Sequence, residues 1–189
     1  MPKVDVPAVL LVGTSVLYPV IAAIAVRTVG PGWVVGGLLV FLLLRALTDR
    51  ARRTPGALTW GLLAAAAGLL LVALFDRELS VRLYPAFMNA AMFLAFGQTL
   101  LRGPSMIERF ARLTDPDLPA SGVVYTRIVT LVWTGFFAIN GLIAVWTALW
   151  ADWKTWTLYN AGVAYGLIGV LIVGELLVRP FARRVMEAR

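Results

Sequence analysis

Long apolar stretches recur along nearly the whole chain, and they constrain its fold more than any other feature. We read six of them as spans, at 7–26, 33–47, 58–75, 83–101, 125–150 and 153–178. About 20 apolar residues in a helix cross the hydrocarbon core of a bilayer. With 60% hydrophobic and 14% charged residues, the chain is also more apolar than a soluble domain. The sequence therefore predicts an all-α polytopic membrane protein, with residues 1–189 forming one six-helix transmembrane domain.

The basic residues between these spans are distributed unevenly on the two sides of the membrane. Most lie before the first span and after the second, fourth and sixth spans, which places them on one side. The other side holds only Arg27, Arg77, Arg82 and Lys154. Because Lys and Arg collect in cytoplasmic loops, we expect a bacterial inner-membrane protein with both termini in the cytoplasm. The same rule accounts for the net charge of +7, and no nucleic-acid partner is predicted.

The chain has no cysteine and no histidine. Thiol nucleophiles, serine–histidine arrangements, disulfides, haem ligation and imidazole metal sites are therefore excluded. Only carboxylates remain as metal ligands, and no pair of them has helical ligand spacing inside a span. We accordingly predict no metal, no cofactor and no named catalytic residue.

A short helix at about 105–114 is expected on the cytoplasmic membrane surface, between the fourth and fifth spans. Its apolar residues recur at helical spacing and leave the charged residues mainly on another face, as in interfacial helices. Ser105 and Glu108 have the S-x-x-E spacing of a capping box. Glu108 can therefore have a structural role as part of this capping box or a functional role on the cytoplasmic surface, and the sequence favours neither.

Three asparagines are predicted to form a polar layer inside the bilayer. Asn89, Asn140 and Asn160 lie at similar depths, roughly 10–15 Å from the outer surface at 1.5 Å per residue. Amides at one depth can hydrogen-bond across helices and hold a bundle together. The alternative is a polar pocket that opens to the periplasm.

A second polar layer is predicted near the cytoplasmic boundary. Its members within the spans are Arg45, Gln98, Arg127, Thr130, Glu175 and Arg179, and the surface helix adds Glu108, Arg109 and Arg112. Such a cationic rim suits an anionic head group, a phosphopantetheine or an acidic protein surface. The alternative is a set of snorkelling arginines plus one structural ion pair between Glu175 and Arg179, four residues apart on one helix.

Several motifs between Tyr84 and Arg179 resemble those of a small bacterial inner-membrane family. They are Tyr84-Pro85 with Asn89, Ile107 to Leu113, Tyr125-Thr126-Arg127 with Thr130 and Trp133, Phe136-Phe137 with Asn140, Tyr159-Asn160, and Gly174-Glu175 with Arg179. Members of that family occur in gene clusters for aryl-polyene and xanthomonadin-type pigments, beside acyl carrier proteins, acyltransferases and exporters. The label "ketosynthase", sometimes given to such proteins, conflicts with the absence of cysteine and histidine.

Three functions are compatible with these observations. The first is a non-catalytic subunit for assembly or export of lipid-linked pigments, which docks a carrier protein, an acyltransferase or an anionic lipid on its cationic face. The second is a small transporter or lipid flippase, which could act as a homo-oligomer. The third is an acyl-chain enzyme with Glu175 or Glu108 as general base. An arginine neighbour disfavours the third, because it stabilises the ionised carboxylate and lowers its basicity.

Overall fold

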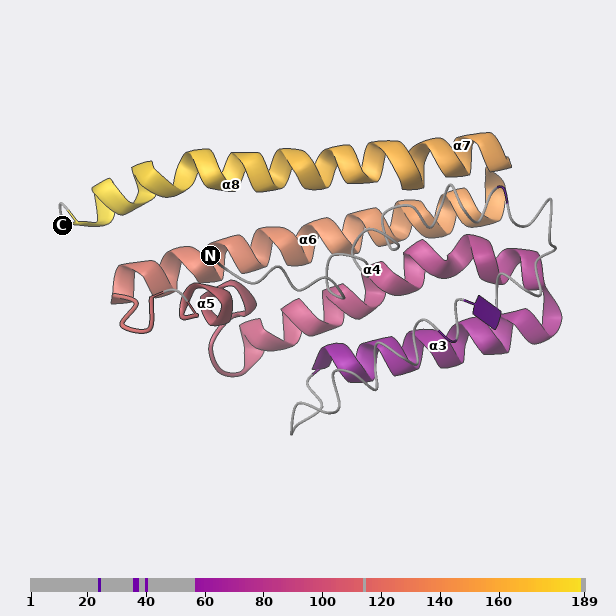
Figure 1. The fold of residues 1–189 in the computed structure, drawn as a ribbon, viewed down its shortest axis with the longest axis horizontal. Coiled ribbons are helices and arrows are strands. Elements are labelled where there is room, and N and C mark those ends of the chain that lie inside the picture. Colours follow the sequence, from indigo (N-terminus) through magenta and orange to yellow (C-terminus); the bar gives the residue numbers. More distant parts are fainter. Residues whose placement is uncertain (1–23, 25–35, 38–39, 41–56, 114, 188–189) are drawn as a thin grey trace, which may run out of the picture.

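The computed structural model describes residues 24, 36–37, 40, 57–113 and 115–187. Its elements are the helices α3 (Ala57–Phe75), α4 (Arg77–Leu101), α5 (Met106–Ala111), α6 (Ala120–Trp150), α7 (Trp153–Thr157), the π-helix η1 (Leu158–Val163) and α8 (Ala164–Glu187). Figure 1 shows the long helices side by side in the order α3, α4, α6, α8. The short α5 lies at one end of this row, near the C-terminal end of α8, and α7 lies at the other end.

The predicted all-helical fold is confirmed for the described part of the chain. Three segments are long and apolar enough to cross a membrane, namely Arg77–Leu101, Ala120–Trp150 and Trp153–Ala182, and Trp60–Phe75 is a shorter apolar helix. The spans predicted at 7–26 and 33–47 lie outside the described residues except for positions 24, 36–37 and 40.

Several helix boundaries in the structure differ from those predicted from the sequence. Helix α4 begins at Arg77 rather than at residue 83, because the Asp76 side chain accepts a hydrogen bond from Leu79 N (2.9 Å) and caps the helix. Helix α6 begins at Ala120 rather than at 125, and α5 is confined to Met106–Ala111. The charged first turns of α4 lower its hydropathy, which is why the apolar pattern placed the start too late.

Small residues bring neighbouring helices into close contact. A Cβ on Gly68 would lie 2.5 Å from the Phe87 ring, and one on Gly141 would lie 3.1 Å from Cβ of Asn89. The first contact joins α3 to α4, and the second joins α4 to α6. The missing side chain at 141 therefore lets α6 approach the polar centre of α4.

A buried cluster closes the α7 end of the row. It contains Leu62, Leu69, Val81, Tyr84 and Trp156, with Ala66 and Ala148 between them. Trp156 is completely buried, so it is a core residue. This packing fixes the α6–α7 turn against α4.

Candidate functional site

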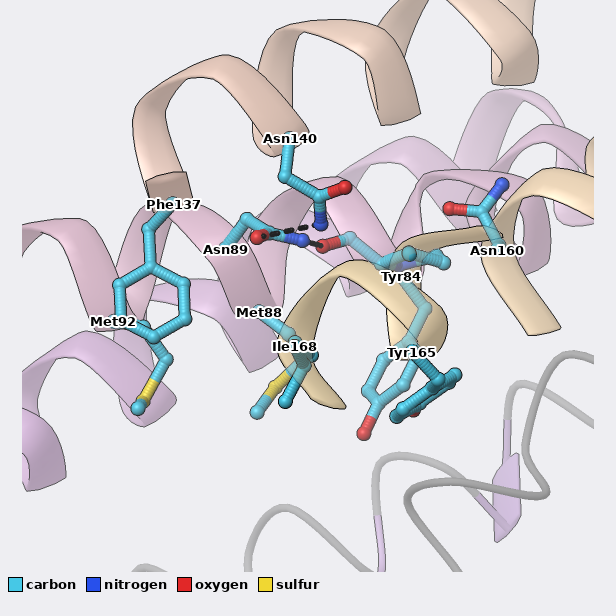
Figure 2. Close-up of a pocket in the computed structure, with 11 residues that line it drawn as sticks. Tyr84, Met88, Asn89, Met92, Phe137, Asn140, Asn160, Tyr165 and Ile168 are labelled. Carbon is cyan, nitrogen blue, oxygen red and sulfur yellow. Dashed lines mark hydrogen bonds between the residues drawn. The ribbon is translucent and has the colours of Figure 1, made fainter. Parts of the chain in front are cut away.

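Asn89 and Asn140 meet across α4 and α6. Asn140 Nδ2 donates to Asn89 Oδ1 (3.0 Å), as Figure 2 shows. Asn89 Nδ2 donates in turn to the carbonyl of Pro85 (2.7 Å), and the Tyr159 hydroxyl donates to Asn140 Oδ1 (2.8 Å). A carbonyl can only accept, so the Pro85 end fixes the direction of every bond in this chain. The hydrogen bond between amides expected from the sequence is present for this pair.

Asn160 lies in the π-helix η1 and is bonded separately from the other two amides. Its Nδ2 donates to Trp156 O (2.9 Å) and to Thr147 Oγ1 (3.2 Å). A π turn shifts the backbone pairing by one residue, so the Asn160 side chain supplies a donor to the carbonyl four residues earlier. Hydropathy carries no signal for such a turn, and sequence reasoning missed it.

All three asparagines line one cavity of about 190 Å³ between α4, α6 and the η1–α8 segment. Met88, Met92, Phe137 and Ile168 are among its apolar residues. No charged side chain is among the described residues that line it. The predicted polar layer thus surrounds an open, mostly apolar cavity with an uncharged polar wall.

At the other end of the row, α5 is fixed by hydrogen bonds to its first-turn N–H groups. Met106 N donates to Thr99 Oγ1 (2.9 Å) on α4, and Ile107 N donates to Thr130 Oγ1 (3.1 Å) on α6. The predicted capping box is confirmed, since Glu108 N donates to Ser105 Oγ and Ser105 N donates to Glu108 Oε2. Thr130 therefore holds α5 in place and does not face a ligand.

The arginines at this end bond mainly to the protein itself. Arg112 forms an ion pair with Glu108 (2.9 Å) and also donates to Pro116 O. Arg109 Nε donates to Pro104 O (3.0 Å) while its side chain remains exposed. Glu108 is buried, capped and paired, which supports its structural interpretation.

A second cavity, of about 340 Å³, lies between α5, α6 and α8. Tyr125, Glu175 and Arg179 are its polar residues together with Thr126, and Phe110, Trp133 and Ile172 are among its apolar residues. The ion pair expected between Glu175 and Arg179 is not formed. In the described part of the chain, the ion pair observed is the one between Arg112 and Glu108. Glu175 and Arg179 instead present opposite charges to the cavity beside the Tyr125 hydroxyl.

Gln98 and Arg127 belong to a different surface. They line a cavity of about 910 Å³ between α3, α4 and α6 that is mostly apolar. Arg127 Nη2 donates to the carbonyl of Leu100 (2.7 Å) at the end of α4. The expected cationic rim is therefore divided between two faces of α6, and Arg45 lies outside the described residues.

Sequence reasoning missed Arg82, which it treated as a loop charge. Arg82 donates to the carbonyls of Thr147 (2.9 Å) and Ala151, and its guanidinium lies 5.5 Å from the Trp153 ring centroid. Trp156 Nε1 donates back to Arg82 O (2.9 Å). A cation at a helix C-terminus satisfies unpaired carbonyls and complements the helix dipole. Asp76 followed by charged residues was the available signal that the helix starts before Arg82.

These arrangements are suited to binding more than to bond breaking. The described residues contain no group of three or more Asp and Glu that could hold a metal ion. Glu175 has no second acid or base among the described residues that line its cavity, other than the Tyr125 hydroxyl and the Arg179 cation. The three cavities are the features with capacity for a ligand: the one around the asparagines has no charged residue in its described lining, and the other two have charged lining residues.

The described residues form a helical protein in which three helices are long and apolar enough to span a membrane. No family model, no curated protein and no solved structure matches the chain.

Proposed function

We propose that this protein is a non-catalytic, six-span subunit of the bacterial inner membrane that serves the assembly or export of lipid-linked pigments of the aryl-polyene type. Both termini and α5 lie on the cytoplasmic side, in agreement with the distribution of basic residues. The resemblance between Tyr84 and Arg179 supports the pigment context. Acyl carrier proteins and acyltransferases are the partners that this context supplies.

The observation that supports the proposal most is that hydrogen bonds to α4 and α6 hold α5 in one orientation. Its first-turn N–H groups are all paired, and Gly103 (φ 79°) allows the tight reversal that returns the chain from α4 to α5. The outward face then presents Arg109 beside Phe110, which is 55% exposed. Arg102 is exposed at the end of α4. A cationic surface with an apolar centre, held in one orientation, favours an acidic protein partner.

The adjoining cavity between α5, α6 and α8 could receive the cargo of a docked carrier protein. A carrier protein delivers an acyl chain on a phosphopantetheine, which has an anionic phosphate and an apolar cargo. Arg179 supplies a cation at the cavity, and Ile107, Trp133 and Ile172 supply apolar surface. An acyl group delivered beside α5 would therefore meet a compatible site within the membrane.

The test is a titration of purified acyl carrier protein against this protein in phosphatidylcholine nanodiscs. Charge reversal of Arg102 and Arg109 together (R102E/R109E) should weaken binding by about 25-fold or more, since an exposed charge pair contributes up to about 1 kcal/mol and reversal adds repulsion. Reversal of Arg77 and Lys154 at the opposite end is the matched control and should leave the affinity unchanged. Equal affinities in all three proteins contradict docking on α5.

A lipid flippase is the second candidate, because polar cavities lie at both ends of the α6–α8 contact. Helix α8 has many exposed apolar side chains, among them Val170, Leu176 and Leu177. Movement of α8 against α6 would join the two cavities. Transport of a fluorescent lipid in proteoliposomes, lost in Asn140→Leu or Glu175→Gln, would favour this candidate over docking.

A further inference from the structure

We propose that the cavity lined by Asn89, Asn140 and Asn160 binds the uncharged, hydroxyl-bearing head group of a single-chain amphiphile. This inference does not depend on docking at α5, which lies at the opposite end of the described bundle. It concerns a site inside the membrane-spanning segments. Asn140 is ten residues before Trp150, the last residue of α6, which corresponds to about 15 Å along the helix.

The first step of the argument is an unpaired acceptor on Asn160. Both hydrogens of its Nδ2 are engaged, one by Trp156 O and one by Thr147 Oγ1. Trp156 O can only accept, so the amide cannot be reversed, and Oδ1 is the atom left over. Figure 2 shows this oxygen turned toward the Asn89–Asn140 pair and the nitrogen turned away.

The Asn160 side chain is 3% exposed, so its Oδ1 has little access to bulk solvent. No described residue donates a hydrogen bond to this atom. An amide oxygen that opens onto the cavity and receives no hydrogen from the described residues can accept a hydrogen bond from a ligand hydroxyl. Tyr159, Asn140 and Asn89 bond to one another in a fixed direction, and none of them donates to Asn160 Oδ1.

The second step is the absence of charge among the described lining residues. A carboxylate, phosphate or ammonium placed there would lose hydration with no counter-ion to replace it. An uncharged hydroxyl needs only a hydrogen bond. The site therefore selects a neutral polar head group over an ionised one.

The third step is size and shape. A cavity of 150 Å³ can hold benzene, so about 190 Å³ holds a glycerol-sized group but not a whole lipid. Met88 and Met92, four residues apart on α4, form one apolar stripe along the cavity wall. Methionine adapts to the shape of its neighbour, so this stripe suits a flexible acyl chain.

The experiment uses a monoacylglycerol with a diazirine in its acyl chain as the probe, and the full chain in phosphatidylcholine nanodiscs. Photolabelling should fall on α4 and α8 residues around the cavity, as mapped by mass spectrometry. The free fatty acid with the same diazirine chain should label these residues at least about tenfold less, because it is charged. Equal labelling by the fatty acid would overturn the proposal.

Two variants separate the acceptor from the cavity. Asn160→Leu should lower labelling by about tenfold, the loss expected for one hydrogen bond. The dimethyl ether of the probe, which has no hydroxyl, should label wild type and N160L equally weakly. Labelling by the ether as strong as that by the diol would show that Asn160 does not select a hydroxyl.

Ile168→Trp fills the cavity without changing any polar group and covers the case in which N160L does not fold. Val170→Trp is the matched control, since Val170 is on the same helix and 68% exposed. Labelling should be lost in I168W and kept in V170W, and equal labelling of the two would overturn the proposal. The R102E/R109E variant should label like wild type, so this result is separable from failure of docking at α5.

Discussion

Replacement of Thr130 by valine tests whether α5 is held by hydrogen bonds to the spanning helices. Valine has nearly the shape of threonine, so the substitution removes the hydroxyl and little else. Thr130 Oγ1 accepts from Ile107 N at 3.1 Å and is completely buried. The Ile107 N–H would then lose its partner at the start of α5, which costs about 1–3 kcal/mol.

That cost predicts the size of the effect. Opening of the first turn of α5 should become roughly 5- to 150-fold more frequent, because each 1.4 kcal/mol changes an equilibrium tenfold. Amide hydrogen exchange at Met106 and Ile107, followed by mass spectrometry in nanodiscs, measures this directly. Peptides from the middle of α6 should exchange as in wild type.

Thr134→Val is the control for this experiment. Thr134 lies one turn further along α6, is also buried, and donates to the carbonyl of Thr130 (2.7 Å) just as Thr130 donates to that of Thr126 (2.8 Å). It accepts no hydrogen bond from α5 among the described residues. If T134V accelerates exchange in α5 as much as T130V does, the hydrogen bond to Ile107 is not what fixes the helix.

Three further predictions concern the rest of the bundle. Arg82→Gln should lower the free energy of unfolding by about 1–3 kcal/mol, because it weakens the cap on the carbonyls at the end of α6, whereas exposed Arg77→Gln should be neutral by the same thermal melt. Gly68→Ala should cost about 1–3 kcal/mol through its clash with the Phe87 ring, while Gly166→Ala, with open space around it, should not destabilise the protein in the same assay. The backbone N–H of Thr155 donates to Asp152 and holds the pKa of that carboxyl below its ordinary value. The stabilisation is therefore present above the unfolded pKa and is lost as pH falls through the folded one, so Asp152→Ala should lower the melting temperature at pH 7 and flatten the acid limb of the profile, with the difference from wild type shrinking below the folded pKa.

Much of the fold followed from apolar periodicity and local capping signals. The Ser105–Glu108 spacing predicted the start of α5 correctly, because a capping box is a local device that needs no knowledge of tertiary contacts. Depth counting placed Asn89 near Asn140, since two neighbouring antiparallel helices bring equal depths together. Helix identity and one cross-helix contact were therefore predictable from the sequence.

Other features depend on tertiary packing and had no sequence signal. The i,i+4 spacing of Glu175 and Arg179 permits an ion pair but does not require one, and both side chains line the neighbouring cavity without pairing. Arg82 gains its role only because the end of α6 packs against the start of α4. The π turn at Asn160 is a backbone irregularity that hydropathy does not report.

The central claim is docking of a pigment-assembly partner on the cytoplasmic face of α5. Its most direct test extracts the wild-type protein and the R102E/R109E variant from the producing cells in native-lipid particles, and identifies by mass spectrometry the proteins that accompany each. We predict an acyl carrier protein or acyltransferase in stoichiometric amount with the wild type and its loss from the variant, with unchanged phospholipid in both. The same partner in both samples, or phospholipid alone with the wild type, would contradict the claim.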